Sequence, residues 1–394
     1  MRRAPLILFP LSIGCSGDHS LWPEYEVHRS QSDVVIQADP NTAIHDIVSA
    51  GDVDGDGLGD VLVRIETQWG DPVRADLYLG SRLTEGGVFT ASEAQASFAG
   101  YVQGAGPAGD LDDDGLDDIL VGDALGYGVF SGASLAMPGF RDVLDATYTI
   151  SGHLDEAQLL SVLGAGDVDG DGRHDLLIFD ETPKKSRIWL LNTLELPDPG
   201  DDIRAGDTLA SQISRDSEVD VSLRDVGDLT GDGLPNAVLL TGVAEYGVLS
   251  KTELTWVDHD WNAISSVIAI GDVDGDGQTE LGLNTAEGTL IELGPDAWVS
   301  PAPVLGQLES GTGDLDCDGA GELLFSTEDH VSLVPGSDRE FSTPMHAFVD
   351  HPSSVATSLP DLSGDRAAEI ALYQPGSTEI TIYFTPTEAP CASR

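Results

Sequence analysis

The stretch GDVDGDGLGD, residues 51–60, decides the fold of this chain because close copies of it recur throughout. Seven copies begin at Asp52, Asp110, Asp167, Asp228, Asp272, Asp314 and Asp361, and subtracting successive starts gives spacings of 58, 57, 61, 44, 42 and 47 residues. A repeat of this size is typical of solenoids, propellers and arrays.

The first copy has the composition of a calcium loop. Asp52, Asp54 and Asp56 take positions 1, 3 and 5, Asp60 takes position 9, and Gly57 permits the sharp turn between them. Carboxylates this close repel one another unless a cation lies between them, and hard oxygen ligands in a flexible loop favour calcium over zinc or copper. The carbonyl group of Leu58, at position 7, is the expected backbone ligand.

An EF-hand is excluded, because its loop needs a glutamate at position 12. That position is apolar in every copy: Val63, Val121, Ile178, Leu239, Leu283, Phe325 and Leu372. Short apolar runs directly after position 9 are typical of buried strands. The loop is therefore expected to join two strands. The alternative without a metal is that the copies are only acidic turns, since Asp-Gly pairs favour turns in any protein.

A nine-residue calcium loop between two strands, repeated seven times, resembles the FG-GAP (VCBS-like) repeats of the integrin α-chain β-propeller. The resemblance covers nearly the whole of the expected mature chain, although the Phe-Gly and Gly-Ala-Pro strings of that family are mostly missing, with GAGP at residues 104–107 the nearest match. It implies an all-β, seven-bladed β-propeller with calcium-binding loops between the first two strands of each blade.

Five copies are expected to bind Ca²⁺. The expected ligands are Asp52, Asp54, Asp56, Leu58 and Asp60; Asp110, Asp112, Asp114, Leu116 and Asp118; Asp167, Asp169, Asp171, Arg173 and Asp175; Asp272, Asp274, Asp276, Gln278 and Glu280; and Asp314, Asp316, Asp318, Ala320 and Glu322. The residue at position 7 would contribute only its carbonyl oxygen.

Two copies depart from the pattern. The fourth has Asp228, Thr230, Asp232 and Asn236, which is only two full charges, and is expected to bind weakly. The seventh has Asp361, Ser363, Asp365 and Glu369, but Arg366 replaces the turn glycine. Its fixed positive charge and the loss of a permissive backbone predict an empty site.

Each unit has the pattern of strand, calcium loop, strand, short turn and two further strands. The propeller is expected over residues 32–386, followed by a tail at 387–394, with a strand at Val34–Ile36 completing the last blade so that the ring closes. The extra length of the first three units follows their third strand. The longest irregular segment, residues 197–218, is interpreted as an exposed loop or a disordered excursion.

The N-terminus has the features of an export signal. A basic start, Met1-Arg2-Arg3, precedes a short apolar run that ends before Cys15, so residues 1–14 are interpreted as a signal peptide. LSIGC resembles a bacterial lipoprotein box, although Ser12 stands where leucine is preferred. This resemblance predicts that Cys15 is lipidated, that residues 15–31 form a polar tether, and that the protein lies on the bacterial cell surface. The alternative is an ordinary signal peptide, with Cys15 not lipidated.

Charge narrows the class of partner. The formal net charge is −51, with 69 acidic and 18 basic residues, which excludes a nucleic-acid partner and attraction to anionic lipid. Membrane contact is thus expected only through the lipid anchor, and the protein is expected to be monomeric. Cys317 and Cys391 are left in the mature chain, and whether they pair stays open.

Catalysis has little support in the sequence. The nine histidines are scattered without an HExxH pair, and neither a GxSxG elbow nor a Walker loop is present. We therefore expect a binding module for a protein or glycan, not an enzyme. The turns opposite the calcium loops would carry its partner-binding residues, Trp69, Lys184, Lys185 and Tyr246. A polysaccharide-acting enzyme and a purely structural envelope component are the alternatives.

Overall fold

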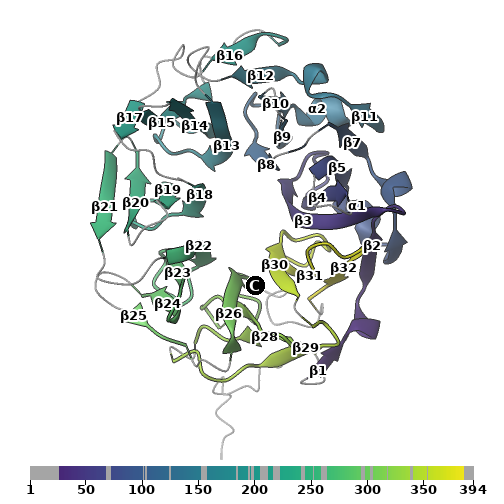
Figure 1. Ribbon diagram of the computed structural model, residues 1–394, viewed down its shortest axis with the longest axis vertical. Coiled ribbons are helices and arrows are strands. Elements are labelled where there is room, and N and C mark those ends of the chain that lie inside the picture. Colours follow the sequence, from purple (N-terminus) through teal and green to yellow (C-terminus); the bar gives the residue numbers. More distant parts are fainter. Residues whose placement is uncertain are drawn as a thin grey trace, which may run out of the picture.

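The strands of this chain form seven separate sheets arranged as blades around one axis (Figure 1). The computed structural model describes residues 26–67, 72–100, 102, 104–123, 126–151, 158–182, 185–193, 196, 199–204, 212–215, 222–240, 245–251, 253–258, 264–293, 298–301, 305–316, 318–337, 340–352 and 354–385. The protein is thus an all-β, seven-bladed β-propeller, as the repeats predict.

Within each blade the strands run from the axis outward. In blade order they are β3 (Thr42–Gly51), β4 (Asp60–Thr67), β5 (Pro72–Tyr78), β7 (Ala96–Ala99) and β11 (Gly139–Arg141); β8 (Gly104–Gly109), β9 (Asp118–Gly122), β10 (Tyr127–Phe130), β12 (Tyr148–Ser151) and β16 (Asp202–Arg204); β13 (Gln158–Gly166), β14 (Asp175–Thr182), β15 (Lys185–Leu191) and β17 (Gln212–Arg215); β18 (Ser222–Gly227), β19 (Asn236–Leu240), β20 (Glu245–Ser250) and β21 (Glu253–Asp258); β22 (Ile264–Gly271), β23 (Glu280–Thr285), β24 (Gly288–Glu292) and β25 (Trp298–Val299); β26 (Gln307–Gly311), β27 (Leu323–Ser326), β28 (Val331–Val334), β29 (His346–Val349) and β1 (Glu26–His28); and β30 (Val355–Leu359), β31 (Glu369–Tyr373), β32 (Glu379–Tyr383), β2 (Val34–Gln37) and β6 (Gly87–Phe89).

The described helices are all single turns between strands. They are α1 (Gly80–Leu83), α2 (Gly132–Leu135), η1 (Arg29–Gln31), η2 (Ala91–Glu93) and η3 (Val143–Asp145). None of the helices in the described ranges is long and apolar enough to span a membrane.

The ring closes through both ends of the described chain. The innermost strand β3 packs against β8 on one side and against β30 on the other. The N-terminal strand expected at Val34–Ile36 is β2, which pairs antiparallel with β32 and completes the seventh blade (Figure 1). Residues near the two ends thus share one sheet, which holds the ring shut.

The buried hydrophobic residues in the described ranges form seven clusters, one at each seam between neighbouring blades. Strand β4 shows why the sequence after each loop is a continuous apolar run. Val61 and Val63 pack into the seam with blade 7, and Leu62 packs into the seam with blade 2. Because successive side chains point to opposite faces and both faces are covered, all of them are apolar.

Four short strands, which we call straps, add a fifth strand to a neighbouring blade. β6, β11 and β16 follow the third strand of blades 1, 2 and 3, and each pairs parallel with the outer strand of the preceding blade; β1 does the same for blade 6. The straps correct two expectations. Glu26–His28 lies in the expected tether yet forms β1, and Asp202–Arg204 and Gln212–Arg215 lie in the supposedly irregular segment yet form β16 and β17.

Candidate metal sites

Backbone hydrogen bonds give the loop of each blade its shape. In the first loop Asp52 Oδ1 accepts from the N–H of Gly55 at 2.8 Å, and Oδ2 accepts from the N–H of Gly57 at 2.9 Å. Gly57 has φ of +86°, a conformation that favours glycine. Asp56 Oδ1 accepts from the N–H of Leu58 at 2.9 Å. The carboxylate at position 1 is therefore the centre around which the loop turns.

Where position 9 is an acid, its carboxylate is buried and stands at the start of the second strand of the blade, or directly before it in the sixth loop. In the first loop Asp60 Oδ2 accepts from the N–H of Val53 at 2.9 Å, and Oδ1 accepts from the N–H of Gly80 at 2.7 Å. In the sixth loop Glu322 Oε2 accepts from Leu315 N–H at 2.6 Å, while Oε1 is buried without a hydrogen-bond partner. Asp175 Oδ1 in the third loop is likewise buried without a hydrogen-bond partner.

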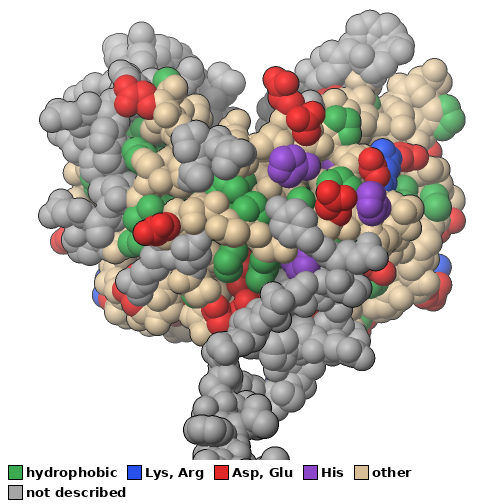
Figure 2. Space-filling view, turned by 90° about the horizontal axis from the view of Figure 1, so that it is seen from below, with side chains coloured by type: hydrophobic (Ala, Val, Ile, Leu, Met, Phe, Trp, Pro, Cys, Tyr) green, Lys and Arg blue, Asp and Glu red, His purple; other side chains and the backbone are tan. Residues whose placement is uncertain are grey.

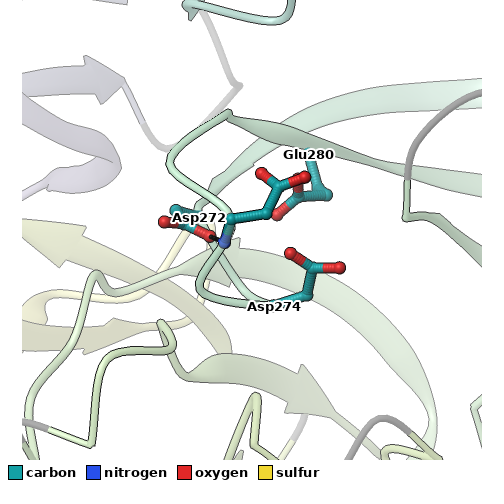
Figure 3. Close-up of side chains that lie close together, drawn as sticks. Asp272, Asp274 and Glu280 are labelled. Carbon is teal, nitrogen blue, oxygen red and sulfur yellow. Dashed lines mark hydrogen bonds between the residues drawn. The ribbon is translucent and has the colours of Figure 1, made fainter. Parts of the chain in front are cut away.

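The loops bring these carboxylates together. Six such groups lie in the described part of the chain, each with one ligand atom per residue within 4.8 Å of the others, and they include Asp52, Asp54 and Asp60; Asp110, Asp112 and Asp114; Asp167, Asp169 and Asp175; Asp272, Asp274, Asp276 and Glu280; and Asp314, Asp316, Asp318 and Glu322. Figure 3 shows three members of the fifth-loop group gathered at one turn. Asp56, Asp118 and Asp171 are not part of these five groups. That the carbonyl groups at position 7 are calcium ligands stays a prediction.

Burial makes the position 9 carboxylates hard to ionise. Desolvation, with a further contribution from neighbouring loop carboxylates, raises the pKa of Asp60, Asp118 and Asp175 to about 7. The same causes raise the pKa of Glu280 and Glu369 to about 8 and that of Glu322 to about 9. A buried carboxylate that faces other carboxylates is stabilised by a cation.

The fourth loop has a cation of its own. Lys251, in the turn after β20, places Nζ 3.1 Å from Asp232 Oδ2, and this contact holds the pKa of Asp232 below its ordinary value. Asn236 replaces the position 9 acid and accepts from the N–H of Leu229 at 2.8 Å, while its Nδ2 is buried without a hydrogen-bond partner. The expected weakness of this site therefore has a second physical reason, which the sequence did not reveal.

The seventh loop keeps the shape of the others. Arg366 has φ of +73°, and its N–H donates to Asp361 Oδ2 at 2.8 Å, as the glycine N–H does in the first loop. Arginine therefore occupies a left-handed conformation that favours glycine, and the turn is kept. That this loop is empty stays a prediction.

Two side chains contact carboxylates of a loop to which they do not belong. One contacts the third loop, and the other extends from the third loop to the second. Asn192, after β15, donates from Nδ2 to Asp169 Oδ2 and Asp171 Oδ2, both at 2.7 Å. Arg173 lies with Nη2 at 3.3 Å from Asp113 Oδ2 of the second loop. The contact of Asn192 with the third loop was not predicted. Asn192 follows the third strand of the blade, and only the folded blade brings the end of that strand beside the loop.

The structure describes only part of the expected partner-binding set. Tyr246 is 1% exposed and packs in the seam between blades 4 and 5, so its assignment to an exposed face is wrong. Trp69 and Lys184 lie outside the described residues, and Lys185 begins β15. Cys15, Cys317 and Cys391, together with the expected signal peptide and the tail at 387–394, also lie outside them.

Comparison with known proteins supports the fold. A chain of the crystal structure of BBS1N in complex with ARL6DN, soaked with mercury, superposes with a TM-score of 0.56 at 9% identity, covering 90% of this chain and 97% of that chain. A lead-soaked crystal of the same complex gives 0.56 at 10%, covering 88% and 93%. Chaetomium thermophilum Raptor gives 0.53 at 12%, covering 91% of this chain but 29% of Raptor.

At these identities the likeness is one of fold alone. No protein-family profile matches the chain, and comparison with curated proteins finds no match.

Proposed function

We propose that this protein is a calcium-stabilised propeller of the FG-GAP/VCBS type whose rigid ring serves as an exported binding module. The proposal that the protein binds calcium rests on the surroundings of Glu322. Its side chain is 0% exposed, one of its carboxylate oxygens has no hydrogen-bond partner, and a carboxylate oxygen of Glu322 lies within 4.8 Å of those of three further acidic residues. An all-oxygen set of this kind fits a hard cation. Bound calcium would neutralise the carboxylates and tie the first strand of the blade to the second.

Calcium titration of chelator-treated protein by isothermal titration calorimetry tests this proposal. We expect about five sites, with the fourth and seventh loops silent, and a melting temperature that rises with calcium and falls with EDTA. Magnesium serves as the control ion, because it demands a smaller and more rigid octahedral site. Protein that takes up no calcium and melts at the same temperature with EDTA would refute the proposal.

The binding role rests on the closed ring and on the charge. Seven packed seams make a rigid support for the turns at each end of the ring, and turns held on a rigid scaffold are where binding residues are often found. We propose a protein or glycan partner, no nucleic acid, and no membrane contact beyond a lipid on Cys15. Retention of one partner class on immobilised protein with calcium, but not with EDTA, is the expected result; turnover of a glycan panel would favour an enzyme instead.

Export and anchoring are tested separately. Expression in a bacterial host with a clickable fatty acid is expected to label the full chain but not the Cys15→Ser variant. Label on both proteins, or on neither, would contradict lipidation of Cys15.

A further inference from the structure

The third loop differs from the first two in how its position 9 carboxylate is held. In the first loop Gly80 N–H donates to Asp60 Oδ1 at 2.7 Å. In the second loop Gly132 N–H donates to Asp118 Oδ1 at 3.0 Å. Asp175 has the same position in the third loop and is 0% exposed, but its Oδ1 has no hydrogen-bond partner. One oxygen of this buried carboxylate is therefore left to coordinate an ion.

The carboxylates at positions 3 and 5 of the third loop also keep one oxygen each. Asp169 Oδ1 accepts from the N–H of Asp171 at 3.1 Å, and Asp171 Oδ1 accepts from the N–H of Arg173 at 3.0 Å. The second oxygens, Asp169 Oδ2 and Asp171 Oδ2, both face the Asn192 side chain, whose Nδ2 lies 2.7 Å from each of them. The oxygens that the loop backbone does not use thus converge on one carboxamide.

The place of Asn192 in the blade can be compared with that in other blades through the strand register. Asn192 directly follows Leu191, which pairs with position 10 of the third loop. The residues at the same place in five other blades are Leu79, Ser131, Ser250, Pro335 and Phe384. None of these five is a carboxamide, so the contact of Asn192 distinguishes the third loop from theirs.

The negative charge of the protein does not single out one loop. The formal net charge is −51, and on the face shown in Figure 2 acidic side chains are widespread and basic ones are few. Such a charge raises the local concentration of cations over the whole surface. Differences in affinity between the loops must therefore come from their ligands.

A carboxamide can present either of its ends to the third loop. Its oxygen and its nitrogen have nearly the same size, and a half turn about the bond to the amide carbon exchanges them. Such a turn would place Asn192 Oδ1 where Nδ2 now lies, beside Asp169 Oδ2 and Asp171 Oδ2. The carbonyl oxygen of asparagine is one of the ligands that calcium takes.

We propose that Asn192 is a calcium ligand from outside the repeat, and that it makes the third loop the tightest calcium site of this protein. The inference rests on the proposed calcium role. Asn192 Oδ1 and the second oxygen of Asp175 would bring the expected ligands of this loop to about seven oxygens, within the roughly six to eight that calcium takes. The sixth loop also has a carboxylate oxygen without a partner, on Glu322, but Pro335 stands at the place of Asn192.

A crystal structure of the full chain grown in calcium tests the proposal directly. We expect Asn192 Oδ1 to lie about 2.4 Å from the ion in the third loop, which is the length of a calcium–oxygen bond. An ion in that loop with Asn192 turned away from it, or with a water molecule between them, would overturn this inference and leave the calcium proposal standing. Crystals with no calcium in any loop would refute both.

Calorimetric titration of chelator-treated protein measures the effect on affinity. Asn192→Leu, which introduces the residue of the first blade, is expected to weaken the tightest site at least about tenfold, since even groups that only support a metal ligand contribute that much. Asn192→Asp keeps the size of the side chain and supplies a charged oxygen, so it is expected to bind calcium at least as tightly as the wild type.

Ser131→Ala is the matched control, because it changes the same place in the second blade, and it is expected to leave every calcium affinity unchanged. A tightest site that Asn192→Leu does not weaken, with folding verified by circular dichroism, would overturn the proposal. Equal weakening by Asn192→Leu and Asn192→Asp would also overturn it, because it would show that Asn192 acts only as a hydrogen-bond donor to the two aspartates.

Discussion

Asp117 and Asp52 hold each other in a two-way link between the first and second loops. The N–H of Asp117 donates to the carbonyl oxygen of Asp52 at 3.0 Å, and the N–H of Asp52 donates to Asp117 Oδ2 at 2.8 Å. The backbone half of this link recurs where Gly59 reaches Asp361, Thr279 reaches Asp228 and Gly321 reaches Asp272. Position 8 of one loop thus contacts position 1 of the preceding loop, which couples neighbouring sites.

The side-chain half of this link is expected to contribute to stability. Asp117→Ala leaves the N–H of Asp52 without its carboxylate acceptor, so we expect a loss of about 1–2 kcal/mol in the free energy of unfolding, measured by urea denaturation. Asp329→Ala, at an exposed turn of blade 6, is the control and is expected to unfold like the wild type. Equal stability of both variants would show that the link contributes nothing.

Replacement of Glu322 is expected to act in opposite directions with and without calcium. Glu322→Gln removes a buried carboxyl whose pKa is raised to about 9, so the calcium-free protein should gain roughly 1–3 kcal/mol at pH 8. With calcium, one site is lost, which costs about 2.7 kcal/mol when free calcium is a hundredfold above its dissociation constant. Thermal melts with EDTA and with calcium measure both effects. A variant destabilised under both conditions would contradict a metal-ligand role.

The stability of the calcium-free protein is expected to fall as pH rises. The pKa of Asp60 is raised from 3.8 to about 7 in the folded state, so between these values the folded state holds a proton that the unfolded state has lost. Stability is therefore fully present below about pH 4 and is lost as pH rises through 7, and Glu322 extends the window to about 9. Melting temperatures at pH 5 to 9 in EDTA check the sign.

Calcium is expected to show the opposite dependence. It binds ionised carboxylates, so the increment in melting temperature that calcium produces should grow with pH over the same window. A calcium increment that does not vary between pH 5 and 9 would count against the buried position 9 carboxylates as ligands.

The fourth loop is expected to become a calcium site through two substitutions. Asn236→Asp restores the position 9 carboxylate, and Lys251→Met removes the ammonium group that lies 3.1 Å from Asp232. Calorimetry is expected to show one more calcium per chain in the double variant than in the wild type. Arg82→Met, an exposed change in blade 1, is the control for loss of a positive charge. An unchanged stoichiometry would show that Thr230 alone prevents binding.

The local parts of this molecule were predictable from the sequence. Ligand spacing within nine residues, the glycine turn and the apolar run after position 9 are properties of one short stretch, so seven copies predict seven loop-and-strand units. The pairing of β2 with β32 was also within reach, because a closed ring needs a final strand and the chain offers one near Val34. Arg366 shows the limit, since its backbone conformation depends on the hydrogen bond to Asp361.

What the sequence determined by itself is therefore the repeat, the blade and the carboxylates of each loop, because these depend on neighbours along the chain. Only the tertiary structure decided that Tyr246 is buried beside Glu292, that Lys251 lies at the fourth loop, and that straps add a fifth strand to four blades while the other three have four described strands. These contacts join residues that are distant in sequence, and they depend on how neighbouring blades pack, which no local pattern encodes.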